Sequence, residues 1–320
     1  MKWNLGLNFN SSEVFLFNPS DAKQAEFKRF IKERKYHIYI VCKRKKSFFE
    51  KSVSENGCFQ TTLYNLDEKH NKIYFDYKHR DFLKINSYKN GYYNIDNKVE
   101  NGQEMRDIHL ISYFCYHEDM TNRYPVSEPL PSDLEVMYIG QAYGRTKLKT
   151  IDYRVLNHNK IQEIALDILE KGSNEEIIIV GLKFENNALG TSFVGINDKV
   201  IRPTNESMQE LQNKAGKKLT KGQEITVCEA SLISYFRPQL NTEYKKTFPS
   251  KDFTSYDELY EIDFEYSSLV VNTKFYGVRL FSEHIKERKY EHFQYFPLKS
   301  TEDKDSLFEY LYKLNRKEYD

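Results

Sequence analysis

Residues 134–140, Leu-Glu-Val-Met-Tyr-Ile-Gly, form the stretch from which the fold of this chain can be read. Their β-forming side chains predict a strand that ends at a glycine. A glycine that closes a buried strand lets another backbone or a ligand come close. Tyr138 is therefore either a core residue, the ordinary role of a strand tyrosine, or a functional group beside Gly140.

A second apolar run precedes this strand. Residues 109–116, His-Leu-Ile-Ser-Tyr-Phe-Cys-Tyr, also favour a strand, and a loop between the two runs is marked by Pro125, Pro129 and Pro131. We expect residues 109–116 and 134–140 to pair antiparallel across that loop.

A helix pattern follows the glycine. Thr150 or Asp152 can cap a helix that ends before Gly172, and its apolar stripe consists of Ile161, Ile164, Ala165, Ile168 and Leu169. Residues 176–182 are almost continuously apolar, which predicts a buried strand.

Arg154 and His158 lie four positions apart on the predicted helix and so share one face. A cation and an imidazole at the edge of a buried stripe could bind a phosphate and move a proton. The structural alternative is an arginine that extends to solvent beside a hydrogen-bonded histidine.

Thr220 and Gln223 fit a capping box that opens a helix, which stops at about Phe236 because Pro238 follows. Glu229 lies within the buried stripe of that helix, whose other members are Ile225, Cys228, Leu232 and Phe236. A carboxylate there is costly unless it is paired or bound to a cation. Glu229 is thus a Mg²⁺ ligand, an acid or base, or half of a structural ion pair with a buried arginine.

The fold class that these elements predict is α+β, with three regions along the chain. Residues 1–105 form a β-rich N-terminal domain, and residues 106–250 form a central domain of strands and helices. Residues 251–320 form an extension of short strands and a final helix. A further short polar helix is expected over residues 204–215.

Composition points to a globular protein. Aromatic residues make up 15% of the chain and supply core area that the hydrophobic fraction of 39% would otherwise lack. The four cysteines have no metal-site spacing, and neither a signal peptide nor a membrane-spanning run occurs. We therefore expect a cytoplasmic protein with free thiols and no membrane partner.

The net charge of +1 conceals an asymmetry, because residues 1–105 are net basic and residues 251–320 net acidic. Lys43, Arg44 and Lys45 belong to a basic cluster beside aromatic residues, which could contact phosphates. The alternative is a solvated loop between strands.

The order of these features resembles the GIY-YIG nuclease family. Residues 138–140 read Tyr-Ile-Gly, the next helix carries Arg154 and His158, and a later helix carries Glu229, with Asn241 beyond it. The interval from Glu229 to Asn241 is similar to that of GIY-YIG restriction endonucleases. The resemblance covers residues 109–249, less than half of the chain.

The resemblance implies a small domain with a three-stranded antiparallel sheet flanked by helices, which hydrolyses DNA phosphodiesters with one divalent metal. Tyr138, Arg154 and His158 would be catalytic residues. Glu229 would bind Mg²⁺ or Mn²⁺, and Asn241 would be the last catalytic residue of the motif set. A tyrosine would position the attacking water, and the proton acceptor is either that tyrosine or His158.

No Gly-Ile-Tyr precedes residue 138, so the first motif departs from the family's pattern. Residues 111–113, Ile-Ser-Tyr, are the best candidate, and Tyr113 is its tyrosine. Flanking phosphates would be reached by three basic residues, Arg145, Lys147 and Lys149. A solvated basic turn is the alternative for those three residues.

We therefore expect a metal-dependent endonuclease that acts on DNA, with RNA left open, in restriction or phage defence. The flanking regions could select the target, recruit a partner protein or support a homo-oligomer. The alternatives are a GIY-YIG-fold module that binds nucleic acid without cutting it, and an interaction protein that works through its β-rich flanks.

Overall fold

The chain is a mixed α+β protein, in agreement with the predicted class. The fold is given by a computed structural model, which describes residues 4–55, 58–67, 69, 71–79, 82–87, 92–97, 103–120, 129–142, 150–191, 220–242, 245 and 266–297. The expected helices over residues 204–215 and after residue 300 lie outside the described residues. No described helix has the length and apolar character that crossing a bilayer requires.

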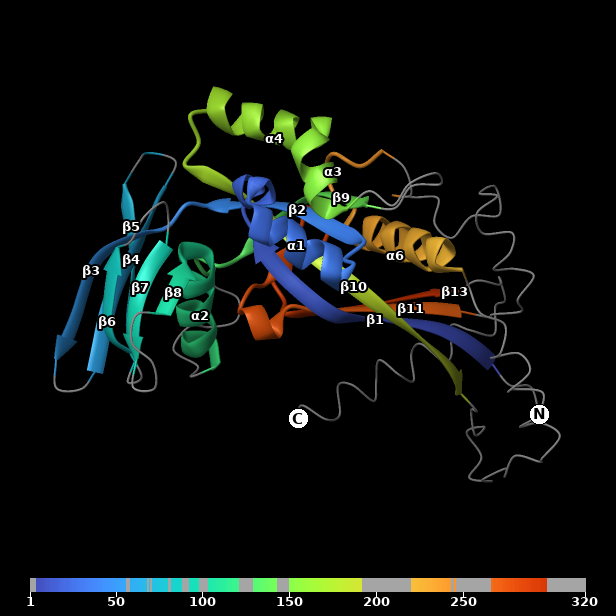
Figure 1. The fold of residues 1–320 in the computed structure, drawn as a ribbon, viewed down its shortest axis with the longest axis horizontal. Coiled ribbons are helices and arrows are strands. Elements are labelled where there is room, and N and C mark those ends of the chain that lie inside the picture. The colour runs from blue at the N-terminus through green and yellow to red at the C-terminus, as the bar shows by residue number, and fades with distance from the viewer. Residues whose placement is uncertain are drawn as a thin grey trace.

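A seven-stranded sheet forms the body of the molecule (Figure 1). In spatial order its strands are β12 (Leu280–Phe281), β9 (Leu134–Gln141), β2 (Ile38–Lys45), β10 (Glu175–Thr191), β1 (Asn4–Phe17), β11 (Tyr266–Asn272) and β13 (Glu291–Pro297). The neighbours in the run β9-β2-β10-β1 pair antiparallel, whereas β11 joins β1 in parallel. Each of the three predicted regions contributes strands to this sheet, so the boundaries near residues 105 and 250 do not coincide with its limits.

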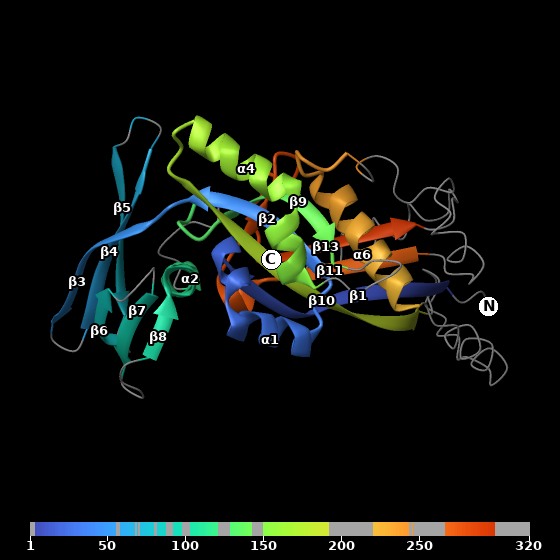
Figure 2. The same cartoon turned by 45° about the horizontal axis from the view of Figure 1, so that its top comes forward.

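The segment between β2 and β9 lies to one side of the large sheet (Figures 1 and 2). It holds two three-stranded antiparallel sheets and a helix, namely β3 (Phe48–Glu55), β4 (Cys58–Leu66), β5 (Lys72–His79), β6 (Phe82–Ser87), β7 (Tyr92–Asn97), β8 (Gln103–Arg106) and α2 (Asp107–Met120). The chain thus leaves the large sheet after β2 and returns to the neighbouring position in β9.

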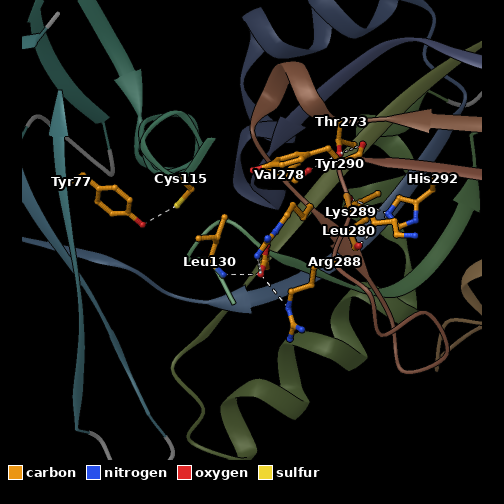
Figure 3. Close-up of polar contacts among 12 residues, drawn as sticks. Tyr77, Cys115, Leu130, Thr273, Val278, Leu280, Arg288, Lys289, Tyr290 and His292 are labelled. Atoms are coloured by element: carbon orange, nitrogen blue, oxygen red, sulfur yellow. Dashed lines mark hydrogen bonds and ion pairs between the residues drawn. The ribbon is translucent and has the colours of Figure 1, made fainter. Parts of the chain in front are cut away.

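The expected strand over residues 109–116 is wrong, because these residues lie in helix α2. A short apolar run does not distinguish a buried strand from a buried helix. One side of α2 packs on β4 and β5, where Tyr77 Oη and Cys115 Sγ lie 3.3 Å apart (Figure 3). Another side meets the main body at Gly277, where an added Cβ would lie 2.3 Å from the Ser112 carbonyl oxygen. Burial on more than one side removes the single apolar stripe that marks a surface helix.

Successive residues of β2 point to opposite faces of the large sheet and into two cores. One core holds Ile38, Ile40 and Cys42 together with helix α6 (Lys221–Phe236). The other core holds Tyr39 and Val41 and packs against the helices α1 (Ala25–Arg34), α3 (Ile151–Asn157) and α4 (Asn159–Glu170).

Two short 3-10 helices complete the body, η1 (Pro19–Lys23) before α1 and η3 (Lys274–Tyr276) after β11. The thiols of Cys42, Cys115 and Cys228 are free and buried, as expected.

Candidate active site

Two tyrosines from neighbouring strands define the site. Tyr39 in β2 and Tyr138 in β9 have ring centroids 6.3 Å apart. In the antiparallel register Tyr39 lies opposite Gly140. A Cβ on Gly140 would lie 2.6 Å from the Tyr39 hydroxyl oxygen and 2.8 Å from the Tyr138 ring. The glycine therefore permits a close approach, as predicted, but the group that approaches is a side chain.

A second glycine repeats this arrangement on the other side of β2. Tyr39 also lies opposite Gly181 of β10. A Cβ on Gly181 would lie 1.9 Å from the ring of Phe15, which comes from β1. Each aromatic ring thus leans across the neighbouring strand, and the two glycines fix where Tyr39 sits in the sheet.

The predicted helix over residues 150–169 is two helices, and the break falls at His158. The backbone of His158 is extended, with φ −97° and ψ 117°, so Arg154 and His158 do not share one continuous helix. His158 caps α4 instead, because its Nδ1 accepts a hydrogen bond from the Lys160 N–H at 3.2 Å. Asparagines on either side, which favour caps over helix interiors, suit this break.

The cap also determines what the other ring nitrogen of His158 does. Since Nδ1 accepts from a backbone N–H, the neutral ring carries its proton on Nε2. Nε2 lies 3.3 Å from the hydroxyl oxygen of Tyr138. Burial lowers the pKa of His158, and the charges of Arg154 and Lys160 lower it further. His158 is thus a neutral donor to the Tyr138 oxygen.

Arg154, from α3, supplies the positive charge. Its Nε is buried and has no hydrogen-bond partner in the described part of the chain. Burial raises the pKa of Tyr39, and the charges of Tyr138 and Glu229 add to the rise while Arg154 opposes it. The Tyr39 hydroxyl therefore lies within electrostatic reach of three of the predicted site residues.

Glu229 occupies the buried stripe of α6 that the sequence predicts. Its side chain is 9% exposed, and Ile225, Cys228, Leu232 and Phe236 are all buried beside it. No group of three His, Cys, Asp or Glu side chains among the described residues could hold a metal ion. A site with one protein carboxylate still suits Mg²⁺, which keeps several waters and takes other ligands from substrate phosphates.

Asn241 holds the backbone of β9. Its amide oxygen accepts from the Ile139 N–H and its Nδ2 donates to the Ile139 carbonyl, both at 2.9 Å. Leu240 N–H also donates to the carbonyl oxygen of Met137 at 3.2 Å. Asn241 is thus a positioning residue that joins the segment after α6 to the strand that carries Tyr138.

Tyr113 belongs to a different part of the fold from Tyr138. It lies on α2 and packs edge-on against Phe114, beside the core shared with β4 and β5. The three basic residues expected to contact flanking phosphates, Arg145, Lys147 and Lys149, lie outside the described residues.

Tyr39 is not among the site residues that the sequence predicts. Its signal is present, because residues 37–39 read His-Ile-Tyr, which differs from Gly-Ile-Tyr only at the first position. A long segment separates these residues from residues 138–140, so nothing local in the sequence links the two. Only the pairing of β2 with β9 places the two tyrosines together.

Comparisons with protein-family models, with curated proteins and with solved structures give no match for this chain.

Proposed function

We propose that this protein is a divalent-metal-dependent endonuclease that hydrolyses DNA phosphodiester bonds. The observation that carries the proposal is the antiparallel pair β2 and β9, which sets Tyr39 and Tyr138 beside Arg154 and within reach of the Glu229 charge. Two tyrosines, a fixed cation and a buried carboxylate form a set suited to phosphodiester hydrolysis.

The arrangement of strands also supports the resemblance to GIY-YIG nucleases. Strands β9, β2 and β10 are adjacent and antiparallel, and helices pack on both of their faces. We assign the first motif to residues 37–39, where a histidine takes the place of the glycine. The segment from β3 to α2 is then an insertion between the two motifs, and Tyr39 replaces Tyr113 as the tyrosine of the first motif.

Arg154 is proposed to bind the scissile phosphate. A buried guanidinium donor without a partner costs free energy, about 1–3 kcal/mol or more for a charged group. A phosphate oxygen would satisfy the Nε of Arg154 and stabilise the charge that builds on it in the transition state.

Tyr138 is proposed to position the attacking water and, once its hydroxyl has released its own proton to solvent, to accept the water's proton as the phenolate. The Nε2–H of His158 points at the Tyr138 oxygen and would stabilise charge that develops there. Burial raises the pKa of Tyr39, so this hydroxyl stays protonated and acts as a hydrogen-bond donor. His158 is not the base in this scheme, because Nδ1 caps α4 and Nε2 carries a proton.

Glu229 would hold the divalent metal, which when bound supplies a positive charge for the leaving oxygen. The same carboxylate lies close enough to Tyr39 to raise its pKa. Glu229 therefore also favours the protonated, donating form of that tyrosine.

The test incubates wild-type protein and Glu229→Gln with supercoiled plasmid, linear duplex, single-stranded DNA and RNA. Each substrate is assayed in Mg²⁺, in Mn²⁺ and in EDTA. We expect metal-dependent cutting of DNA by the wild type alone. Cutting by Glu229→Gln at the wild-type rate would disprove the site. Salt-sensitive binding without any cutting would favour a non-catalytic nucleic-acid-binding module.

A further inference from the structure

A cavity of about 470 Å³ lies where β2 reaches the inserted segment. The end of β2 lines one side with Lys43, Arg44 and Lys45, and Phe75 of β5 lines another. The volume falls within the range of ligand-binding pockets, roughly 300–1,000 Å³. The cavity is therefore large enough for a small organic ligand.

Arg44 is the unusual group in its wall. Its side chain is 1% exposed, and its Nε donates to Glu176 across the strand pair at 2.8 Å. Both amino groups, Nη1 and Nη2, are buried and have no hydrogen-bond partner within the described residues. A guanidinium presents five donors in a rigid fork that matches phosphate or carboxylate oxygens. The two free amino groups indicate that an anion belongs beside them.

The carboxylates of the cavity wall are directed to other cations. Asp133 forms a two-point ion pair with Arg279, at 2.7 and 2.9 Å. Arg288 Nε lies 3.2 Å from the same carboxylate, and the Leu130 N–H donates to it at 2.8 Å, as Figure 3 shows.

Glu135 and Glu175 each lie 3.5 Å from the Nζ of Lys43. The acidic groups of this wall are thus held by Lys43, Arg279 and Arg288. The carboxylates of this wall are therefore engaged elsewhere, and a ligand anion would be the group that satisfies the amino groups of Arg44.

The remaining wall is mainly apolar and partly aromatic, with Asn65 as its polar member. Its apolar residues are Ile73, Phe75, Pro129, Leu130, Pro131 and Phe281. Such a wall suits the flat face of a base, which stacks on aromatic and aliphatic side chains. We infer that this cavity binds a nucleotide, with its phosphate against Arg44 and its base against the apolar wall.

This cavity is separate from the candidate active site. Arg44 lies five residues beyond Tyr39 on β2, which corresponds to about 17 Å along a strand. The two side chains also point to opposite faces, because their separation is odd. The inference therefore does not rest on the proposed nuclease activity. The nucleotide could be free in solution or be one unit of a nucleic acid chain.

Calorimetric titration in EDTA tests the inference and separates these two sources. The ligands are the four nucleoside monophosphates, inorganic phosphate and a short single-stranded oligonucleotide. We expect saturable binding of a monophosphate if the source is free nucleotide, and of the oligonucleotide alone if it is a chain. Arg44→Lys keeps a charge for Glu176 but removes the fork, so affinity should fall at least about tenfold.

Ile73→Glu provides a second variant in case Arg44→Lys does not fold. Ile73 is 42% exposed at the cavity rim, and a carboxylate there should repel the phosphate and weaken binding at least about tenfold. The matched controls are Tyr74→Glu, next to Ile73 but not on the cavity wall, and Arg34→Lys, an exposed arginine paired with Glu13. Both controls should keep wild-type affinity.

Three results would overturn the inference. The first is that the wild type binds neither a monophosphate nor the oligonucleotide. The second is that Arg44→Lys and Ile73→Glu bind as tightly as the controls. The third is that inorganic phosphate binds as tightly as the best nucleotide, because the apolar wall would then contribute nothing. Since EDTA removes free divalent metal, none of these results depends on cleavage.

Discussion

Each end of strand β2 lies beside an arginine with at least one buried donor that has no hydrogen-bond partner among the described residues. Near Tyr39 this residue is Arg154, which reaches the strand from helix α3. At the other end it is Arg44, which belongs to β2 and pairs with Glu176 at 2.8 Å. Arg154 forms no ion pair in the described part of the chain.

This difference separates two kinds of anion site. Arg154 keeps its full charge, which suits the stabilisation of charge that develops during a reaction. Arg44 is largely neutralised by Glu176, so it offers directed donors more than net charge, which suits selective binding. The same strand thus supports a site proposed for catalysis at one end and a site proposed for recognition at the other.

The variant with the largest expected effect also distinguishes the two sites proposed at the ends of β2. Glu229→Gln removes the charge of the only protein carboxylate proposed to hold the metal, so DNA cleavage should fall by about a thousandfold. Nucleotide affinity at Arg44 should not change. Plasmid cleavage and calorimetry on the same preparation measure both quantities. A parallel loss of both activities would show that the two ends are one site.

Asn241→Ala should destabilise the part of the sheet near Tyr39, because Asn241 holds the backbone of β9. It leaves the N–H and carbonyl of Ile139 without their side-chain partner, at about 1–3 kcal/mol for each buried group. Urea denaturation should show a loss of several kcal/mol, and Asn241→Asp should restore part of it through the N–H alone. Unchanged stability in Asn241→Ala would show that this clamp is not needed.

The two tyrosines should differ in their effect on cleavage. Tyr138→Phe removes the proposed proton acceptor and should lower kcat about a hundredfold. Tyr39→Phe removes only a donor and should cost less, about tenfold. Tyr113→Phe, in the separate core of α2, is the control and should keep the wild-type rate. A larger loss in Tyr39→Phe than in Tyr138→Phe would reverse the assigned roles.

His158 combines a cap with a chemical role, and two substitutions separate them. His158→Asn keeps a capping side chain but removes the Nε2–H, so kcat should fall about tenfold with stability nearly unchanged. His158→Ala also loses the cap of α4 and should cost about 1 kcal/mol of stability. Equal kcat values for His158→Asn and wild type would remove His158 from the mechanism.

The smallest expected effect is on the stability of the folded protein at low pH. Burial, together with the charges of nearby lysines, lowers the pKa of His37 from 6.5 to about 4. The unfolded chain therefore takes up a proton at a higher pH than the folded chain, so stability is lost as pH falls from about 6.5 toward 4.

His37→Gln should remove part of this loss, about 1 kcal/mol because His37 is only partly buried. The measurement is the urea midpoint of wild type and variant at neutral pH and near pH 4. An equal drop in both proteins would exclude His37 as the source of acid sensitivity.

Local features of the sequence predicted several parts of the site. The capping box at Thr220 and the stripe around Glu229 are both present in α6, because they depend on contacts within one helix. The strand over residues 134–140 is also confirmed. Gly140 does allow a close approach, but the groups that approach are tyrosine side chains and not the backbone or ligand that was expected. Each of these predictions needs only neighbouring residues and their periodicity.

Predictions that depended on contacts between segments distant in the sequence were less successful. Residues 109–116 are helical, and the strand that pairs with β9 is β2. The helix break at His158 was missed as well, because its cap competes with continued helix at a residue flanked by asparagines. The basic run over residues 43–45 is strand and not loop, which turns Arg44 inward.

The sequence alone determined the strand of Tyr138, the helix of Glu229 and the mixed α+β class. Only the tertiary structure decided that Tyr39 joins Tyr138, that Asn241 clamps β9 and that Arg44 faces a cavity. The physical reason is that helix periodicity and caps act over a few residues, whereas strand pairing joins segments at any separation. An apolar strand fits many partners, so its own residues do not specify which one it meets.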